Sequence, residues 1–185
     1  NDGDGKADSK KLVKSLKREK AVLTIFSDED QLEEFIDKHE RKFEKAKANF
    51  QDLLDFEIIT ASDNSNKFDA SLEEVFHLIS DYGYSEVYPK QFGKEKNSVI
   101  GGLMNNARGG YFQKVPNKYP KEAYYTYDDK SCDYDCQITE YFYWGMTSVL
   151  GGQKAPGRLE QIQDEWRLNT PAKVLFLSPK LSSSM

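Results

Sequence analysis

Apolar residues recur every three or four positions along much of the chain, which is the spacing of one face of an α-helix. This spacing predicts helices over residues 9–20, 28–50, 71–83, 97–108, 135–150 and 157–168. Two short runs of β-branched and aromatic residues, 21–26 and 56–61, predict strands. The sequence therefore predicts an α+β fold that is mostly α, with a small sheet packed on helices.

The helix expected over 71–83 has the clearest start. Ser71 predicts an N-cap, and Glu74, three residues later, would complete a capping box. Leu72 and Val75 begin an apolar stripe that predicts one face against a core. Gly83 predicts the end of the helix.

This helix also carries candidate chemistry. Glu73 and His77 are four residues apart and therefore share one face, where a carboxylate and an imidazole can both bind a metal. Together with Glu74 they form the pattern E-E-x-x-H, one residue away from the zinc-protease motif H-E-x-x-H. The alternative is structural, because carboxylates in a first turn are favoured by the helix dipole and His77 can be an ordinary half-buried histidine.

The helix expected over 135–150 is apolar nearly all round, which is typical of a central helix. Glu140 is its one carboxylate beyond the entry turn. A buried carboxylate must be paired, protonated, hydrogen-bonded or bound to a metal. If Glu140 faces the Glu73 pair, it completes a three-ligand metal site with an open position for water. Otherwise Arg108 or Arg158 could pair with it.

A tyrosine hydroxyl near such a metal could stabilise an oxyanion. Tyr134 is the first candidate, because it precedes Glu140 by six residues, and Tyr127 is the second.

The chain has 185 residues, enough for one domain with a real core, which we expect at 11–181 between a tether at 1–10 and a tail at 182–185. The net charge of −5 argues against a nucleic-acid partner. No apolar run approaches the ~18 residues of a membrane helix, so no membrane partner is expected.

The two cysteines, Cys132 and Cys136, are too few for a four-ligand zinc site. They can form a local disulfide in an oxidising compartment if the backbone there is a turn or a helix start, and the alternative is two free thiols. The disulfide and the acidic start of the chain both favour a secreted or extracellular protein.

The start of the chain, N-D-G-D-G-K-A-D, resembles the end of the short calcium repeats of extracellular and bacterial surface proteins. Asp2, Asp4 and Asp8 could supply carboxylates to calcium on a glycine-turned loop. Lys11 stands where an EF-hand needs Glu, so the segment is not an EF-hand. The alternative is a flexible polar linker.

The order of these parts resembles the zincin metalloproteases of the gluzincin kind, in particular those of the anthrax lethal factor catalytic-domain type. In that family a motif helix is followed, some tens of residues later, by a Tyr and then by a Glu-bearing aromatic helix. E-E-V-F-H at 73–77 holds the first place, and Tyr134 with I-T-E-Y-F at 138–142 holds the second. The resemblance implies a zincin-like domain with zinc or another divalent metal at Glu73, His77 and Glu140, a general base at Glu74 and assistance from Tyr134.

Glu73 departs from the family motif, and the added negative charge would weaken zinc binding and raise the pKa of a bound water. We therefore expect a degenerate metalloprotease-like domain with little or no peptidase activity, which binds a peptide or protein in its cleft. The second hypothesis is a non-enzymatic extracellular interaction domain with a calcium-binding tether, whose binding face is the aromatic-rich segment 111–144. The third is an active hydrolase with an unusual metal site.

Overall fold

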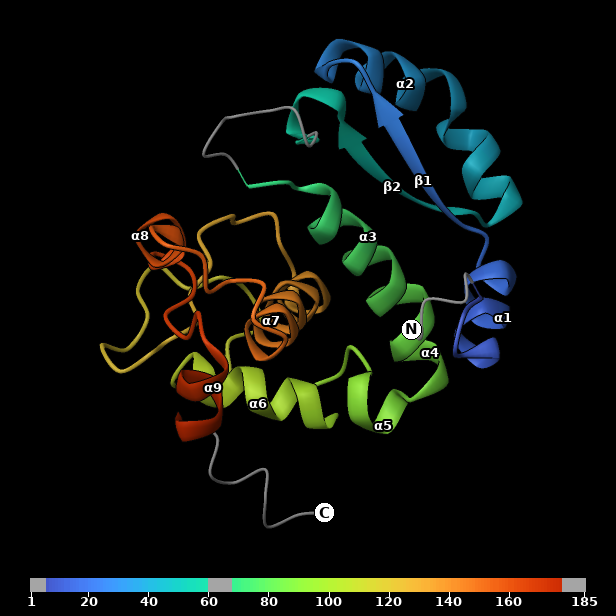
Figure 1. Ribbon diagram of the computed structural model, residues 1–185. Helices are drawn as coiled ribbons and strands as arrows, with labels where there is room; N and C mark the ends of the chain where they lie inside the picture. Colours follow the sequence, from blue (N-terminus) through green and yellow to red (C-terminus); the bar gives the residue numbers. More distant parts are fainter. Residues whose placement is uncertain (1–5, 60–67, 178–185) are drawn as a thin grey trace. The chain divides into compact units, whose positions relative to one another are not determined.

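Helices account for most of the residues that the computed structural model describes, which are 6–59 and 68–177 (Figure 1). The chain divides into two compact units, Asn1–Pro89 and Lys90–Met185, and the predicted domain at 11–181 includes parts of both. The first unit contains a two-stranded parallel sheet. The fold is α+β and mostly α, as the sequence predicts.

The elements follow one another in a simple order. The first unit contains α1 (Lys10–Arg18), β1 (Ala21–Phe26), α2 (Glu29–Ala46), β2 (Asn49–Leu54), the 3₁₀ turn η1 (Asp55–Glu57), α3 (Ser71–Ile79), the π-helix η2 (Ser80–Tyr84) and α4 (Ser85–Val87). After α5 (Pro89–Phe92), the second unit contains α6 (Val99–Ala107), α7 (Tyr134–Val149), α8 (Arg158–Ile162) and α9 (Pro171–Leu177). No helix within the described ranges combines the length and the apolar character needed to cross a membrane.

The sheet of the first unit holds α3 in place. β1 pairs with β2 from Ala21 opposite Asn49 to Phe26 opposite Leu54. Both α2 and α3 pack on the two strands, and Figure 1 shows them on opposite sides of the pair. The buried Phe26 ring lies 5.1 Å from the Phe35 ring on α2, so aromatic packing joins the sheet to that helix.

Two predicted boundaries in this unit are wrong. The helix expected over 28–50 ends at Ala46, because Lys47 adopts the left-handed conformation (φ 49°) and its N–H donates to the Glu44 carbonyl oxygen. The second strand is β2 at 49–54. Residues 56–59 of the strand expected at 56–61 are not in a strand, and residues 60 and 61 lie outside the described residues. The Asn49 side chain donates to the Glu19 carbonyl oxygen (2.8 Å), which fixes the start of this strand beside β1.

The helix expected over 71–83 begins at Ser71, as predicted, but its predicted cap and end are wrong. The N-cap is Ala70, and Ser71 is the first helical residue, whose N–H (2.9 Å) and hydroxyl both donate to the Asp69 carboxylate. The hydroxyl bond is the main reason why the pKa of Asp69 is lowered. Gly83 does not end the helix, because the chain continues through η2 into α4.

α7 is the central helix of the second unit, as its apolar sequence predicts. Most of its residues are buried, and α6 and α9 pack against it. Side-chain hydrogen bonds tie it to distant segments, since Trp166 donates to the Ser148 hydroxyl (2.9 Å) and Tyr125 donates to the Gln137 carbonyl oxygen (2.9 Å). The predicted disulfide between Cys132 and Cys136 is present and spans the start of the helix.

Candidate metal centre

α3 presents Glu73 and His77 on one face, one helical turn apart. His77 is buried and Glu73 is half-buried. Leu72 and Val75 are 48% and 38% exposed, so the prediction that this apolar stripe faces a core is wrong for these two residues. The buried residue of α3 is instead the polar His77.

Glu74 lies next to His77 and is hydrogen-bonded to strand β2. Its Oε2 atom accepts a hydrogen bond from the Gln51 amide on β2 (2.5 Å) and lies 3.7 Å from His77 Nδ1. A carboxylate beside Nδ1 favours a proton on that nitrogen and leaves Nε2 as the metal-binding atom. The position of Glu74 therefore suits the orientation of His77, and its predicted role as a general base stays a prediction.

Glu140 projects from the middle of α7 and is half-buried. Burial raises the pKa of the Tyr127 hydroxyl, and the charge of the Glu140 carboxylate raises it further, so Tyr127 stays neutral at physiological pH. The second of the two predicted tyrosines is thus the one whose pKa responds to Glu140.

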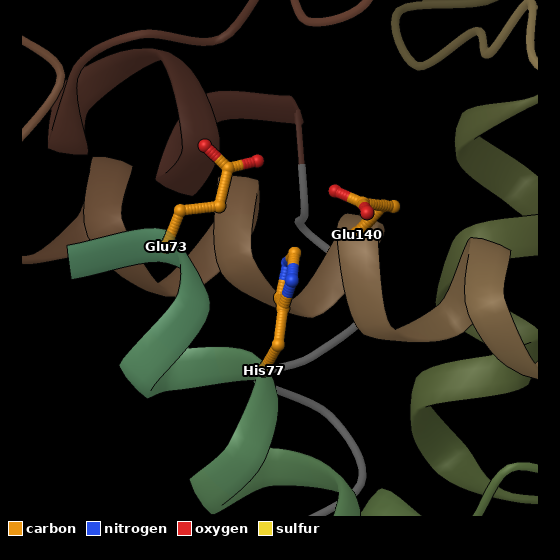
Figure 2. A group of neighbouring side chains, drawn as sticks. All are labelled: Glu73, His77 and Glu140. Carbon is orange, nitrogen blue, oxygen red and sulfur yellow. The ribbon is translucent and has the colours of Figure 1, made fainter. Parts of the chain in front are cut away.

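Glu73, His77 and Glu140 form one group in the structure (Figure 2). One potential ligand atom from each side chain lies within 4.8 Å of the other two. Within the described ranges, this is the only set of three or more His, Cys, Asp or Glu side chains close enough to hold a metal ion. The three residues predicted as metal ligands are therefore brought together.

The donor set is chemically suited to a divalent transition metal. Imidazole and carboxylate are both zinc ligands, and three protein ligands leave a coordination position for water. Two carboxylates would neutralise both charges of the ion, whereas the motif with two histidines and one glutamate leaves it a net positive charge. The group could also hold manganese or iron, which accept oxygen-rich sites.

The other predicted catalytic residue, Tyr134, lies elsewhere in the second unit. It is buried, its hydroxyl donates to the Asn105 side chain (3.2 Å), and its ring faces the Arg108 guanidinium. Arg108 also bonds with Gln137. The assignment of Tyr134 to catalysis stays a prediction, and its contacts are those of a packed core residue.

Two residues near the group are not predicted by the sequence. Glu165 is half-buried, and its pKa is raised to about 7, first by burial and then by the charges of Glu140 and Asp128. Gln51 directly follows the helix predicted over 28–50 and lies in no predicted strand. Nothing in the sequence therefore indicates its hydrogen bond to Glu74.

The remaining predicted features have separate positions. Asp8 is exposed, and Asp2 and Asp4 lie outside the described residues, as does the tail at 182–185, so the calcium site stays a prediction. Much of the aromatic-rich segment is core, because six of its members are buried: Tyr125, Tyr134, Tyr141, Phe142, Tyr143 and Trp144.

The chain was also compared with known proteins. No protein-family model, no curated protein and no solved structure matches it.

Proposed function

We propose that Glu73, His77 and Glu140 bind a divalent transition metal, with zinc as the first candidate, in a metalloprotease-like domain of low or absent peptidase activity. The observation that carries this proposal is the convergence of their ligand atoms within 4.8 Å. The resemblance of E-E-V-F-H to the zincin motif and of the Glu140 helix to the family's second helix supports it.

The surroundings of the three side chains support the proposal. The Glu74 carboxylate accepts a hydrogen bond from the Gln51 amide and lies 3.7 Å from His77 Nδ1. Histidine ligands of metals in proteins usually have such a carboxylate partner, which orients the ring and sets its basicity. The Tyr127 hydroxyl is close enough to Glu140 for the charge of that carboxylate to raise its pKa.

The low expected activity follows from the charge of the ligands. A metal in this position lowers the pKa of its water and polarises a carbonyl group. Glu73 places a second carboxylate where the zinc-protease motif has a neutral histidine, which makes the ion less electron-withdrawing and the water less acidic. The domain would then bind a peptide more readily than it hydrolyses one.

The disulfide supports a secreted or extracellular location, because such bonds persist in oxidising compartments. The burial of the aromatic residues favours the metal proposal over an interaction domain with an aromatic face, since buried rings cannot form that face.

The test is the metal content of the full chain purified without chelator, measured by elemental analysis. We expect about one equivalent of zinc or another transition metal, which His77→Ala and Glu140→Ala should lose. His39→Ala and Glu160→Ala are matched controls, because these residues lie on α2 and α8 outside the group. Circular dichroism of each variant checks folding.

Retention of the metal in folded His77→Ala and Glu140→Ala protein would contradict the proposal. Glu73→His adds a second test of the degenerate motif. It should raise zinc affinity and give measurable cleavage of a casein substrate. An increase in zinc affinity without cleavage would leave a metal-binding domain and remove the protease-like part of the proposal.

A further inference from the structure

The first helix, α1, packs one side against the rest of its unit and exposes the other. Leu12 and Leu16 lie against Gly83 of η2, and the neighbouring Ser15 is buried. The opposite side carries three exposed lysines, which we call the lysine stripe: Lys10, Lys14 and Lys17. Their spacing of four and three residues places them in one row along the helix.

The lysine stripe lines a groove of about 390 Å³. The rest of the wall consists of Ala7 and Val13, so the groove contains three positive charges and no carboxylate. None of the three lysines forms an ion pair or a side-chain hydrogen bond with another described residue. Glu19 and Glu86 both pair with Arg18, so they do not neutralise the stripe.

The sequence of α1 places positive charge where a helix disfavours it. The first turn carries Lys10 and Lys11 and no carboxylate, although the helix dipole repels cations at this end. Neighbouring lysines of the stripe are three or four residues apart, so they also repel one another. Asp8, which precedes the N-cap, is exposed and does not line the groove. An anion bound along the stripe would relieve both repulsions.

A second set of lysines with the same spacing shows that this arrangement is not simply that of a solvated helix. The α2 lysines are also exposed: Lys38, Lys42 and Lys45. Glu34 forms an ion pair with Lys38, and Glu44 lies between the other two in the sequence. α2 contains more acidic than basic residues, whereas α1 contains no acidic residue. The charge of the lysine stripe is therefore uncompensated, and that of the α2 lysines is not.

The shape of the stripe suits a linear polyanion. Lys10 and Lys17 are seven residues apart, so the row is about 10 Å long and one side chain wide. The apolar side chains of the wall, Ala7 and Val13, are small, so the groove offers no large apolar residue for insertion into lipid. It also offers no aromatic ring on which a nucleic-acid base could stack.

We propose that the lysine stripe binds a sulfated polysaccharide, whose sulfate groups accept charge-assisted hydrogen bonds from the three lysine ammonium groups. The preference for a linear polyanion rests on the stripe itself. The choice of a polysaccharide over a nucleic acid rests in addition on the secreted location proposed above. Neither depends on the metal centre.

The experiment is isothermal titration of the full chain with a heparin oligosaccharide of defined length. The test variant combines three substitutions: Lys10→Gln, Lys14→Gln and Lys17→Gln. The control variant makes the same change in the α2 lysines: Lys38→Gln, Lys42→Gln and Lys45→Gln. Both variants lose three exposed positive charges with the same helical spacing, and glutamine favours helices about as well as lysine does. Circular dichroism of each variant checks folding.

The test variant should bind the oligosaccharide about 10–100-fold more weakly than wild type at low salt, because three lysines no longer displace counterions from the polyanion. Its affinity should also depend less steeply on salt concentration. The control variant should bind like wild type. His77→Ala should bind like wild type as well, so a failure of the metal proposal does not affect this test.

The absence of heparin binding by wild type would overturn the proposal, as would an equal loss of affinity in the test and control variants. Wild type is also titrated with chemically desulfated heparin, with single-stranded DNA and with phosphatidylserine vesicles. Weak or absent binding of all three probes is the expected result. Binding of desulfated heparin as tight as that of heparin, or tighter binding of the DNA or the vesicles, would show that the stripe does not select a sulfated polysaccharide.

Discussion

Glu165 should make the stability of the second unit depend on pH, and Glu165→Gln should remove that dependence. Its pKa is raised from 4.5 to about 7 by burial and by the charges of Glu140 and Asp128. In the unfolded chain these influences are lost, and the carboxyl group ionises near 4.5. Between these two values the folded protein holds a proton that the unfolded chain has released.

The sign follows from proton linkage. A state that binds more protons is favoured at low pH, so the contribution of Glu165 to stability is fully present below about pH 4.5 and is lost as the pH rises to about 7. A pKa difference of one between the folded and unfolded states corresponds to about 1.4 kcal/mol, so the full loss is at most about 3 kcal/mol. Solvent screening of this half-buried carboxylate reduces the loss to about 2 kcal/mol.

The glutamine of Glu165→Gln is neutral at every pH, so the variant lacks this loss. It should therefore gain about 2 kcal/mol of unfolding free energy relative to wild type between pH 4.5 and about pH 8.

Tryptophan fluorescence during urea unfolding measures this quantity in the right part of the molecule. Trp144 and Trp166 are the only tryptophans of the chain, and both are buried in the second unit. Glu160→Gln is the control, because it removes an exposed carboxylate from the same unit. A chelator in every sample prevents a metal from altering the comparison.

The reasoning would be refuted if the difference in unfolding free energy between Glu165→Gln and wild type were the same at pH 4.5 and about pH 8. It would also be refuted if Glu160→Gln changed with pH as strongly as Glu165→Gln. A difference that grows across this range only in Glu165→Gln would show that the second unit keeps a destabilising carboxylate at neutral pH. Such a cost is common where a charged group serves binding or catalysis.

Two further predictions concern single contacts. Gln51→Leu removes the hydrogen bond that holds Glu74 beside His77 and should weaken metal binding by about 10–100-fold in a competition titration, whereas Tyr134→Phe should leave it unchanged. Gly101→Ala should lower the unfolding free energy by about 1–3 kcal/mol in urea unfolding, because the new Cβ would clash with the Glu95 carbonyl oxygen. Gly102→Ala should raise it by about 0.5–1 kcal/mol, because its Cβ would meet no atom within 4 Å. Equal effects of the two substitutions in either comparison would contradict the corresponding prediction.

Much of the fold can be predicted because the signals are local. Four of the six residues of β1 are of types that favour strands, and α7 is apolar nearly all round, so the sequence places both to within a residue or two. The end of α2 cannot be predicted in this way. Lys47 takes a left-handed conformation that its residue type disfavours, and tertiary packing of β2 beside β1 overrides the helical pattern.

Only part of the candidate site can likewise be predicted from local signals. The sharing of a face by Glu73 and His77 follows from helical spacing, and Glu140 is noticeable as a lone carboxylate on an apolar helix. The hydrogen bond of Gln51 to Glu74 joins residues 23 positions apart, and Gln51 lies outside the predicted helices and strands. No periodicity connects such residues, so only the folded chain reveals them.

The π-helical segment η2 has a consequence for how this sequence is aligned with others. A π turn contains one residue more than the α-helix it interrupts. Deletion of one residue from 80–84 would restore regular α-helix and leave the helices on either side in register, because the wide turn takes up the extra residue. Glu86, whose carboxylate lies 2.9 Å from Arg18 on α1, would then keep its partner. A homologue without the extra residue would need a one-residue gap here, and an ungapped alignment would misplace either the histidine helix or α4.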